Sequence, residues 1–205
     1  MSGVLILGAG GHAKVVADIL MSQGTHVHGF LDDDPNLCGE MRLGLPVLGA
    51  IDPYLDYEPD GLIIGIGDNR ARRSIAERLS TEAQRLWRNA VHPQATIARS
   101  VRLGRGIVVA AGAVINPDSV LGDHAIINTG ATVDHDCTIG GFVHVAPGAR
   151  VAGGVVLGEG AFLGIGSSLI PKISVGEWTT IGAGSVVTSD LAANLVAFGV
   201  PARAQ

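Results

Sequence analysis

One aliphatic residue recurs at every sixth position through the second half of this 205-residue chain. From Ile97 to Val187, all sixteen positions of this hexad carry Ile, Leu or Val, and the next residue is usually Gly or Ala. A second compact residue stands four positions after the aliphatic one, as in Ala113, Ala131 and Ser167. A period of six fits neither an α-helix nor a simple strand, whose periods are about 3.6 and about 2. A short period sustained over about 90 residues is typical of a solenoid, so the second half is predicted to be a β-helix.

Each hexapeptide is expected to form one short strand and one bend. The aliphatic side chain points into a narrow prism, and the small residues ease the corners, where the chain turns sharply. Backbone hydrogen bonds then run between stacked coils, so that the strand edges are paired along the helix. The period alone does not give the handedness of such a helix. Crossovers between parallel strands are generally right-handed, so a left-handed helix could not be inferred from the repeat itself.

The first part of the chain has the pattern of an α/β unit. The apolar run "VLILG" at residues 4–8 is followed by a segment whose apolar residues have helical spacing. Gly8, Gly10 and Ala13 form G-x-G-x-x-A at this junction. Such glycines let backbone N–H groups at the start of a helix approach a phosphate or another polar ligand. His12 lies at the same helix start, where it either touches the ligand or is satisfied within the protein.

Two further strands are expected at residues 26–31 and within residues 61–69. Asp32 and Asp33 end the first of them and Gly67 ends the second, at the edge where an open parallel sheet binds ligands. Three βα units in about 90 residues make one mononucleotide-binding half, which is too short for a dinucleotide. This length disfavours NAD and favours a smaller conjugate such as a nucleotide sugar. The following helix is expected to present three arginines to solvent: Arg70, Arg72 and Arg73.

The stretch from Thr129 to Ala149 holds two histidines and two aspartates in an otherwise aliphatic setting punctuated by glycine. An imidazole that titrates near neutrality is suited to accept a proton from an attacking nucleophile, and a neighbouring carboxylate can orient its ring. His135 is the candidate base. Adjacent strand residues point to opposite faces, so Asp136 reaches that ring only where a corner or a neighbouring chain bends the geometry. Asp134 is therefore a second candidate for orienting the ring.

Other histidines of the repeat have competing interpretations. Two histidines on a tight aliphatic prism are hard to explain as packing alone, which makes His144 a second functional candidate. His124 is expected to be an exposed bend residue. Three histidines on a solenoid can also bind zinc. His124, His135 and His144 occupy three different phases of the hexad, however, so stacking does not make them converge and no metal is expected.

Composition and charge exclude several classes of partner. The net charge is -5 and no long run of Lys or Arg occurs, so neither a nucleic acid nor an anionic membrane surface is expected as a partner. The N-terminus lacks the basic start and cleavage site of a signal peptide, and no window reaches the roughly 18 apolar residues of a membrane span. Cys38 and Cys137 are expected to be reduced thiols. These features predict a soluble, cytoplasmic protein with a small-molecule partner.

Six segments together resemble the sugar acyltransferases of the bacillosamine and perosamine N-acetyltransferase type and their sialic acid O-acetyltransferase relatives. They are "GAGGHAKVV", "FLDDD", "IGDN", "HPQATI", "INTGATVDHDCTIGGFVHVAPGA" and "FGVPAR". The resemblance implies a half-Rossmann α/β domain for nucleotide-sugar binding at residues 1–92. It implies a left-handed parallel β-helix with three hexapeptides per coil at residues 93–205. It also implies a homotrimer with active sites between neighbouring prisms.

The resemblance also assigns roles to individual residues. It makes His135 the general base and Asp136 the residue that raises its basicity, while His144 contacts acetyl-CoA and Ile165 and Ala183 line the pantetheine groove. The nucleotide-sugar site is implied at Gly10, Gly11, His12, Asp32, Asp33 and Gly67. Members of this group often carry a loop that protrudes from the β-helix, whereas the hexad here runs unbroken.

These observations predict an acetyl-CoA-dependent N-acetyltransferase acting on the 4-amino group of a nucleotide-linked 4-amino-4,6-dideoxy sugar. A UDP-linked sugar is favoured, GDP-perosamine is possible, and the product would serve glycan or lipopolysaccharide biosynthesis. One alternative is O-acetylation of sialic acid or another sugar. The other is a non-catalytic scaffold that binds a nucleotide sugar.

Overall fold

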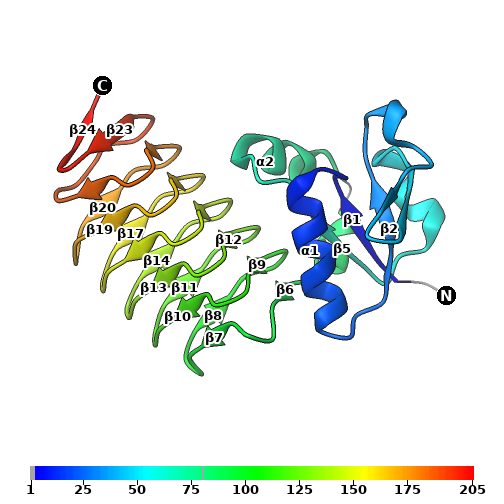
Figure 1. Cartoon of the computed structure of the whole chain (residues 1–205), viewed down its shortest axis with the longest axis horizontal. Helices are drawn as coiled ribbons and strands as arrows, with labels where there is room; N and C mark the ends of the chain where they lie inside the picture. The colour runs from blue at the N-terminus through cyan, green and yellow to red at the C-terminus, as the bar shows by residue number, and fades with distance from the viewer. Residues whose placement is uncertain (1–2, 80) are drawn as a thin grey trace. The chain divides into compact units, whose positions relative to one another are not determined.

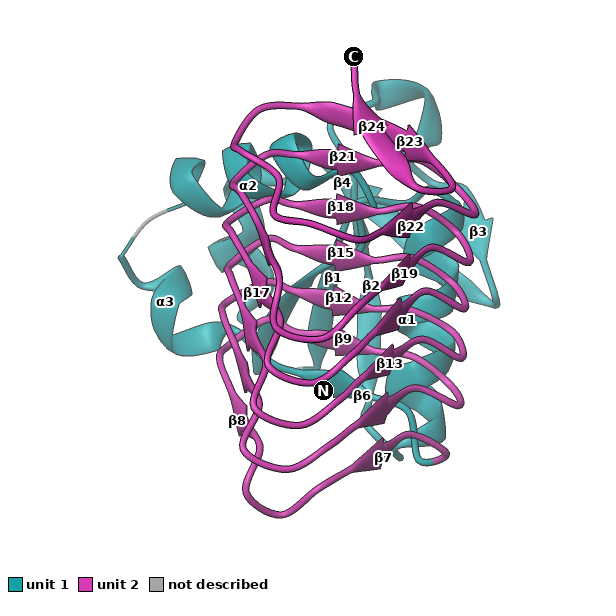
Figure 2. Cartoon of the chain, turned by 90° about the vertical axis from the view of Figure 1, so that its left-hand side faces the viewer, with its two compact units in different colours: residues 1–93 teal, residues 94–205 magenta. Residues whose placement is uncertain are grey.

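The computed structural model describes residues 3–79 and 81–205, and it divides into two compact units, residues 1–93 and 94–205 (Figure 2). The first unit contains a five-stranded sheet in the order β3-β4-β2-β1-β5. All neighbours in this sheet are parallel except β3 and β4, which form an antiparallel hairpin. The strands are β1 (Val4–Leu7), β2 (Val27–Leu31), β3 (Met41–Arg42), β4 (Leu45–Gly49) and β5 (Gly61–Ile64).

Helices connect only part of this sheet. The first crossover from β1 is α1, whereas residues 32–60 form the β3–β4 hairpin and two 3-10 helices in place of the expected second βα unit. Proline and glycine recur through that segment and leave no uninterrupted helical stretch. The remaining elements are α1 (Gly11–Ser22), η1 (Pro35–Leu37), η2 (Asp52–Tyr57), α2 (Asn69–Arg78), α3 (Ala83–Leu86) and β6 (Ala90–Val91).

The second unit is a parallel β-helix whose strands follow the hexad. Sixteen two-residue strands, β7 to β22, each end on one of the hexad aliphatics. Those side chains are buried in every coil after the first, where Ile97 and Leu103 are half-buried. Strands pair at a spacing of 18 residues, as Ile115 does with Val133, so one coil holds three hexapeptides. The predicted fold class, a half-Rossmann α/β domain followed by a parallel hexapeptide β-helix, is confirmed.

The coils stack into three faces (Figures 1 and 2). The first face holds β7 (Thr96–Ile97), β10 (Val114–Ile115), β13 (Thr132–Val133), β16 (Arg150–Val151), β19 (Ser168–Leu169) and β22 (Val186–Val187). The second holds β8 (Arg102–Leu103), β11 (Val120–Leu121), β14 (Thr138–Ile139), β17 (Val156–Leu157) and β20 (Ser174–Val175). The third includes β9 (Val108–Val109), β12 (Ile126–Ile127), β15 (His144–Val145), β18 (Phe162–Leu163), β21 (Thr180–Ile181), β23 (Val196–Gly199) and β24 (Ala202–Ala204).

Left-handed backbone conformations turn the chain at the three corners between these faces. The third corner, between the third and first faces, uses glycine in five coils: Gly112, Gly130, Gly148, Gly166 and Gly184. The first corner, between the first and second faces, uses Asp118, Asp136, Gly154 and Lys172. The second corner, between the second and third faces, uses Gly106, His124, Phe142, Gly160 and Trp178. Positive φ is uncommon for residues other than glycine. At these positions the left-handed turn therefore determines the direction in which the side chain leaves the β-helix.

No helix in the described part of the chain is long and apolar enough to cross a membrane.

Candidate active site

The first corner presents His135 and Asp136 as a hydrogen-bonded pair. Asp136 adopts φ 58°, and its carboxylate Oδ2 lies 2.7 Å from Nδ1 of His135. In an extended strand these neighbours would point to opposite faces, so the left-handed turn is what brings them to the same side. Both side chains are exposed, at 61% for His135 and 65% for Asp136. The pair is thus open to a ligand.

Asp134, the second candidate for orienting the ring, has a different task. Its Oδ1 accepts a hydrogen bond from the backbone N–H of His135 at 2.8 Å and another from Nδ2 of Asn116 at 2.8 Å. These bonds hold the pKa of the Asp134 carboxyl below its usual value, the bond from Asn116 being the larger cause. Asp134 therefore fixes the backbone that carries His135, and Asp136 is the residue bonded to the ring.

The electrostatics of the pair favour a basic imidazole. The hydrogen bond that His135 donates to Asp136 is the main cause that raises the pKa of His135, and the negative charge of Asp134 adds to it. With Nδ1 donating to a carboxylate, the neutral ring leaves Nε2 as its proton acceptor. The ring edge with Nε2 lies over Gly153 in the next coil, where an added Cβ would stand 2.7 Å from that nitrogen. Gly153 was not identified from the sequence, although a glycine pair at 153–154 is visible there.

A direct test of the pair is the pKa of His135 in Asp136→Asn. Because the carboxylate stabilises the protonated ring, its removal is expected to lower that pKa. The ring titration can be followed by NMR, with Asp118→Asn as the matched control because Asp118 occupies the same corner position one coil earlier. An unchanged pKa in Asp136→Asn, or an equal decrease in Asp118→Asn, would contradict the assignment.

His144 lies on the third face, in β15, and not beside His135. Its side chain is largely buried, and Nε2 lies 3.0 Å from Nδ2 of Asn128. The Asn128 amide is oriented by Thr129, whose backbone N–H donates to Oδ1 at 2.8 Å. Since the amide N–H can only donate, Nε2 of His144 accepts and the neutral ring carries its proton on Nδ1. Phe162 packs edge-on against the ring of His144, with the two ring centroids 5.3 Å apart.

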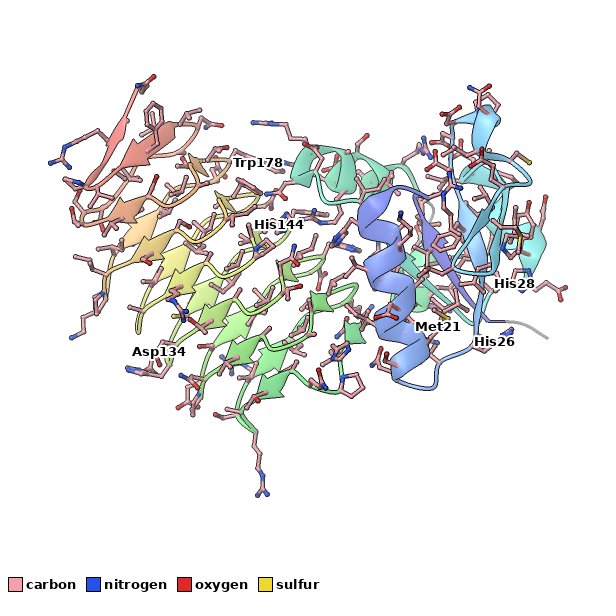
Figure 3. The ribbon with its side chains drawn as sticks, viewed as in Figure 1. Met21, His26, His28, Asp134, His144 and Trp178 are labelled. Carbon is pink, nitrogen blue, oxygen red and sulfur yellow. The ribbon has the colours of Figure 1, made fainter. Side chains whose placement is uncertain are left out.

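Ile165 and Ala183 stand at the third corner, one coil apart and both exposed. His135 stands at the first corner, across the first face from them. Figure 3 likewise shows Asp134 and His144 on different sides of the β-helix. A single chain therefore does not bring the candidate base together with the three residues predicted to contact the coenzyme.

A hollow of about 450 Å³ lies on the first face, between the two corners. Its lining includes Asn116 and Asp134 at the end near His135, and Arg150 in β16 beyond them. The other lining residues are Val114, Thr132, Val151, Ala152, Ser168 and Leu169. The hollow thus carries both a carboxylate and a guanidinium, and the exposed His135 directly follows its lining residue Asp134.

The glycine turn of the first unit leaves an open space in front of α1. Gly8 has φ 102°, and α1 begins after Gly10 without any side-chain cap. An added Cβ at Gly10 or Gly11 would meet no atom within 4 Å, and neither residue has a left-handed φ. The protein's own packing and backbone therefore do not require glycine at these two positions. The uncapped N–H groups and the positive end of the helix dipole face this space.

Asp32 and Asp33, the two acidic residues after β2, form hydrogen bonds with different parts of the first unit. Asp32 lies against the glycine turn, where Oδ2 accepts from the Ala9 N–H at 2.7 Å. Asp33 points away from it, because Oδ1 accepts from the Ile51 N–H at 3.0 Å and Oδ2 pairs with Arg78 at 2.8 Å. Desolvation raises the pKa of Asp33, but the hydrogen bonds from Ile51 and Arg78 and the charge of Arg78 together outweigh it and hold that pKa below its usual value. Of the two, Asp32 is the one placed beside the predicted phosphate turn.

Arg72 was expected on the helix surface, and this expectation is wrong. Its side chain is 1% exposed, and its guanidinium donates to the backbone oxygens of Ile66 and Gly67, each at 3.1 Å, and to Oδ1 of Asn69. Burial lowers the pKa of Arg72 to about 10, so it stays charged at neutral pH. Burial and the charge of Arg72 lower the pKa of His12 to about 4. His12 is therefore a neutral hydrogen-bonding group at pH 7.

His124 occupies a bend with φ 58°, as expected, but it is buried and not exposed. Its ring stacks on Phe142 in the next coil, with centroids 5.1 Å apart. Within residues 3–79 and 81–205, no group of three or more His, Cys, Asp or Glu side chains is placed to hold a metal ion. His124 thus takes part in the packing of the second corner.

Two family models match the chain, one in each unit. Residues 3–79 match the PglD N-terminal domain, and residues 154–189 match the bacterial transferase hexapeptide repeat. Their combination agrees with the observed order of an α/β sheet followed by a hexapeptide β-helix.

Solved structures extend this likeness to almost the whole chain. A mutant of perosamine N-acetyltransferase from Caulobacter crescentus, in complex with CoA and GDP-perosamine, is 44% identical with a TM-score of 0.93, covering 100% of this chain and 97% of that one. The acetyltransferase domain of PglB from Neisseria gonorrhoeae, in complex with acetyl coenzyme A, is 36% identical with a TM-score of 0.87, covering 98% of each. The shared architecture defines a class of two-domain hexapeptide-repeat transferases. The chain belongs to the family of sugar acyltransferases of the perosamine and bacillosamine N-acetyltransferase type.

Curated sequences are matched over shorter stretches. UDP-N-acetylbacillosamine N-acetyltransferase from Bacillus subtilis is 38% identical over 116 residues, which is 54% of this chain and 52% of that protein. An uncharacterised protein of Acanthamoeba polyphaga mimivirus is 34% identical over 124 residues, 60% of this chain and 24% of its own length. The chain thus spans about half and about a quarter of these two relatives.

Proposed function

We propose that the protein is an acetyl-CoA-dependent N-acetyltransferase that acts on the 4-amino group of a nucleotide-linked 4-amino-4,6-dideoxy sugar. The observation that carries this proposal is the exposed imidazole of His135, held by Asp136 through Nδ1 and next in the chain to Asp134, which lines the hollow on the first face. Family membership supports the reaction class, because the solved relatives are sugar acetyltransferases with CoA or acetyl coenzyme A bound. The product would enter glycan or lipopolysaccharide assembly in the cytoplasm.

In this reaction, Nε2 of His135 takes one proton from the sugar amine as the amine nitrogen attacks the acyl carbonyl. The new C–N bond forms, the C–S bond breaks, and the thiolate that leaves is protonated by the imidazolium or by solvent. Asp136 holds the ring in the required tautomer and stabilises the imidazolium. Such a positioned base contributes about 10²- to 10⁴-fold to the rate.

The nucleotide sugar is proposed to bind the first unit with its diphosphate at the start of α1. The open space at Gly10 and Gly11 supports this placement, because oriented N–H groups and the helix dipole both favour an anion there. Asp32 and neutral His12 would accept or donate hydrogen bonds to the nucleoside, and Gly67 and Asp33 would border the site. The GDP-perosamine complex of the 44% identical relative supports a GDP-linked sugar, and the Bacillus relative supports a UDP-linked one.

Gly11→Ala tests the phosphate turn. Alanine is expected to leave the melting temperature unchanged or to raise it, because the position is helical and an added Cβ meets no protein atom. Binding of UDP or GDP, measured by calorimetry, is expected to weaken about 10- to 100-fold, since charge-assisted hydrogen bonds of about 1.5–3 kcal/mol are disturbed. Asp18→Ala, on the exposed side of α1, is the control that keeps the affinity. Unchanged affinity in Gly11→Ala would contradict a diphosphate at this turn.

The coenzyme side of the site is proposed at His144, Ile165 and Ala183. His144 on the third face and Ile165 and Ala183 at the third corner lie apart from His135 at the first corner, so a complete site needs a second copy of the chain. A threefold assembly of flat-sided prisms supplies it, with the base of one protomer facing the coenzyme residues of the next. The active species is therefore expected to have the mass of three chains in solution, and an active monomer would contradict this arrangement.

The acceptor substrate can be identified by measuring thiol release from acetyl-CoA with different candidate acceptors. The candidates are UDP-, GDP- and dTDP-linked 4-amino sugars and hydroxyl acceptors such as sialic acid. We expect turnover with one of the amino sugars. Turnover only with a hydroxyl acceptor would establish the O-acetyltransferase alternative, and binding without turnover for all acceptors would establish the scaffold.

A further inference from the structure

A buried hydroxyl lies directly beneath the corner that carries His135 and Asp136. Ser119 is fully buried inside the prism, one coil before the pair. Its Oγ donates to the backbone oxygen of Asp134 at 2.7 Å and accepts from the backbone N–H of Cys137 at 3.1 Å. These two groups flank His135 and Asp136. One hydroxyl therefore ties together both ends of the four-residue segment that presents the pair.

The position of Ser119 in the repeat is otherwise apolar. Stepping by one coil of 18 residues from Ser119 leads to Val101, Cys137, Val155 and Ile173. A hydroxyl inside such a column is unfavourable unless its hydrogen bonds are made, and here it both donates and accepts. The one hydroxyl of the column thus stands in the coil beneath the candidate base, where it meets the backbone of the corner.

The corner is held from its outer side as well. Asp134 fixes the backbone N–H of His135, and the N–H of Asp136 donates to the backbone oxygen of Pro117 at 3.0 Å. Ser119 adds the inner restraint. With the backbone fixed from both sides, the position of the imidazole depends on its side-chain torsions alone, and the 2.7 Å bond to Asp136 and the contact with Gly153 limit these.

A second residue repeats this arrangement away from the site. Thr179 is fully buried, and its Oγ1 donates to the backbone oxygen of Ala192 at 2.7 Å and accepts from the N–H of Leu195 at 3.1 Å. The corner between those two residues carries none of the candidate site residues. Thr179 is thus a matched control, because its loss removes the same pair of hydrogen bonds without touching the candidate base.

We propose that Ser119 is a positioning residue for the His135–Asp136 pair, acting through the backbone of the corner and not through the substrate. The proposal rests on the proposed function of the pair as an acetyl-transfer base. Without the hydroxyl, the ends of the corner separate and the pair samples geometries in which Asp136 no longer meets Nδ1. A misplacement of about 1 Å at a reacting group costs on the order of 100-fold in rate.

The test compares Ser119→Ala with Thr179→Val in the full-length protein. Both variants are expected to lower the melting temperature, since each leaves buried backbone groups without a partner. Ser119→Ala is also expected to lower kcat roughly 10- to 100-fold with KM unchanged, and to move the NMR pKa of His135 toward its ordinary value. Thr179→Val is expected to keep both kcat and that pKa.

A second pair of variants guards against a general loss of folding. Ser119→Thr keeps the hydroxyl and Ser119→Val replaces it with a methyl group of the same shape. Valine at 101 and 155 shows that this column accepts a β-branched side chain. Threonine should restore kcat and valine should not. Equal kcat in the threonine and valine variants, or wild-type kcat in folded Ser119→Ala, would overturn the positioning role.

The two proposals fail in different ways. If the wild-type protein releases no thiol with any acceptor, the proposed function fails, and the pKa of His135 in Ser119→Ala still reports whether the corner positions the ring. If the wild type turns over and folded Ser119→Ala matches it in kcat, only the positioning role fails.

Discussion

Replacing His135 with alanine is expected to lower kcat about 10²- to 10⁴-fold, the contribution of a well-placed general base. The substitution removes the group that accepts the proton of the sugar amine but leaves the coenzyme and nucleotide regions intact. KM is therefore expected to change little. The ring is 61% exposed and packs mainly against Gly153, so the melting temperature should also stay close to that of the wild type. Thiol release from acetyl-CoA and a thermal melt measure both quantities.

The matched control is His26→Ala. His26 is also exposed, but it precedes β2 at the opposite end of the sheet from the glycine turn. That variant should keep the wild-type kcat. A folded His135→Ala protein with wild-type turnover would remove the base from the mechanism, and an equal loss in His26→Ala would show that the loss is not specific to position 135.

Arg72→Met is expected to give the largest loss of stability. Methionine fills much of the same volume, but the backbone oxygens of Ile66 and Gly67 lose a buried donor, as does the Asn69 side chain. An unsatisfied buried polar group costs about 1–3 kcal/mol, so the free energy of unfolding should fall by about 3 kcal/mol. Because Gly67 borders the proposed nucleotide site, binding of UDP or GDP should weaken as well. Chemical denaturation and calorimetry measure the two effects.

Arg73→Met provides the comparison on the same helix. Arg73 forms an exposed pair with Glu77 at 2.6 Å, four residues along α2, and such pairs are worth about 0.3–0.5 kcal/mol. If Arg72→Met were no more destabilising than Arg73→Met, the buried guanidinium would not be the element that organises the loop after β5.

The β-helix could be predicted from the sequence because every coil must place aliphatic side chains at the same inward positions. The interior of a narrow prism accepts only an aliphatic side chain at the inward position, and this demand is met from Ile97 to Val187 without exception. The relation between His135 and Asp136 could not be predicted in the same way. Corner positions hold aspartate, histidine, phenylalanine, lysine and tryptophan as well as glycine, so residue type alone does not report a left-handed φ. The resemblance implied Asp136, but the residues alone left Asp134 open as a second candidate, and the left-handed turn at Asp136 is what distinguishes the two.

The burial of Arg72 and the role of Ser119 are only weakly indicated by the sequence. Arg72 precedes Ile75, Ala76 and Leu79 by three, four and seven residues, which places it on the buried face of α2. The clustering of arginines concealed this spacing. Ser119 is likewise marked by being a hydroxyl in an apolar column, but its partners are backbone groups of the next coil, which no sequence pattern displays.

The claim that Nε2 of His135 accepts the proton is tested most directly by the pH dependence of kcat. The base works only when neutral, so kcat should fall as the pH drops below the pKa of the ring, and Asp136 raises that pKa. In Asp136→Asn, the acidic limb of the kcat profile should therefore move to lower pH by the same amount as the pKa of His135 measured by NMR. An acidic limb that stays in place while the ring pKa falls would show that another group accepts the proton.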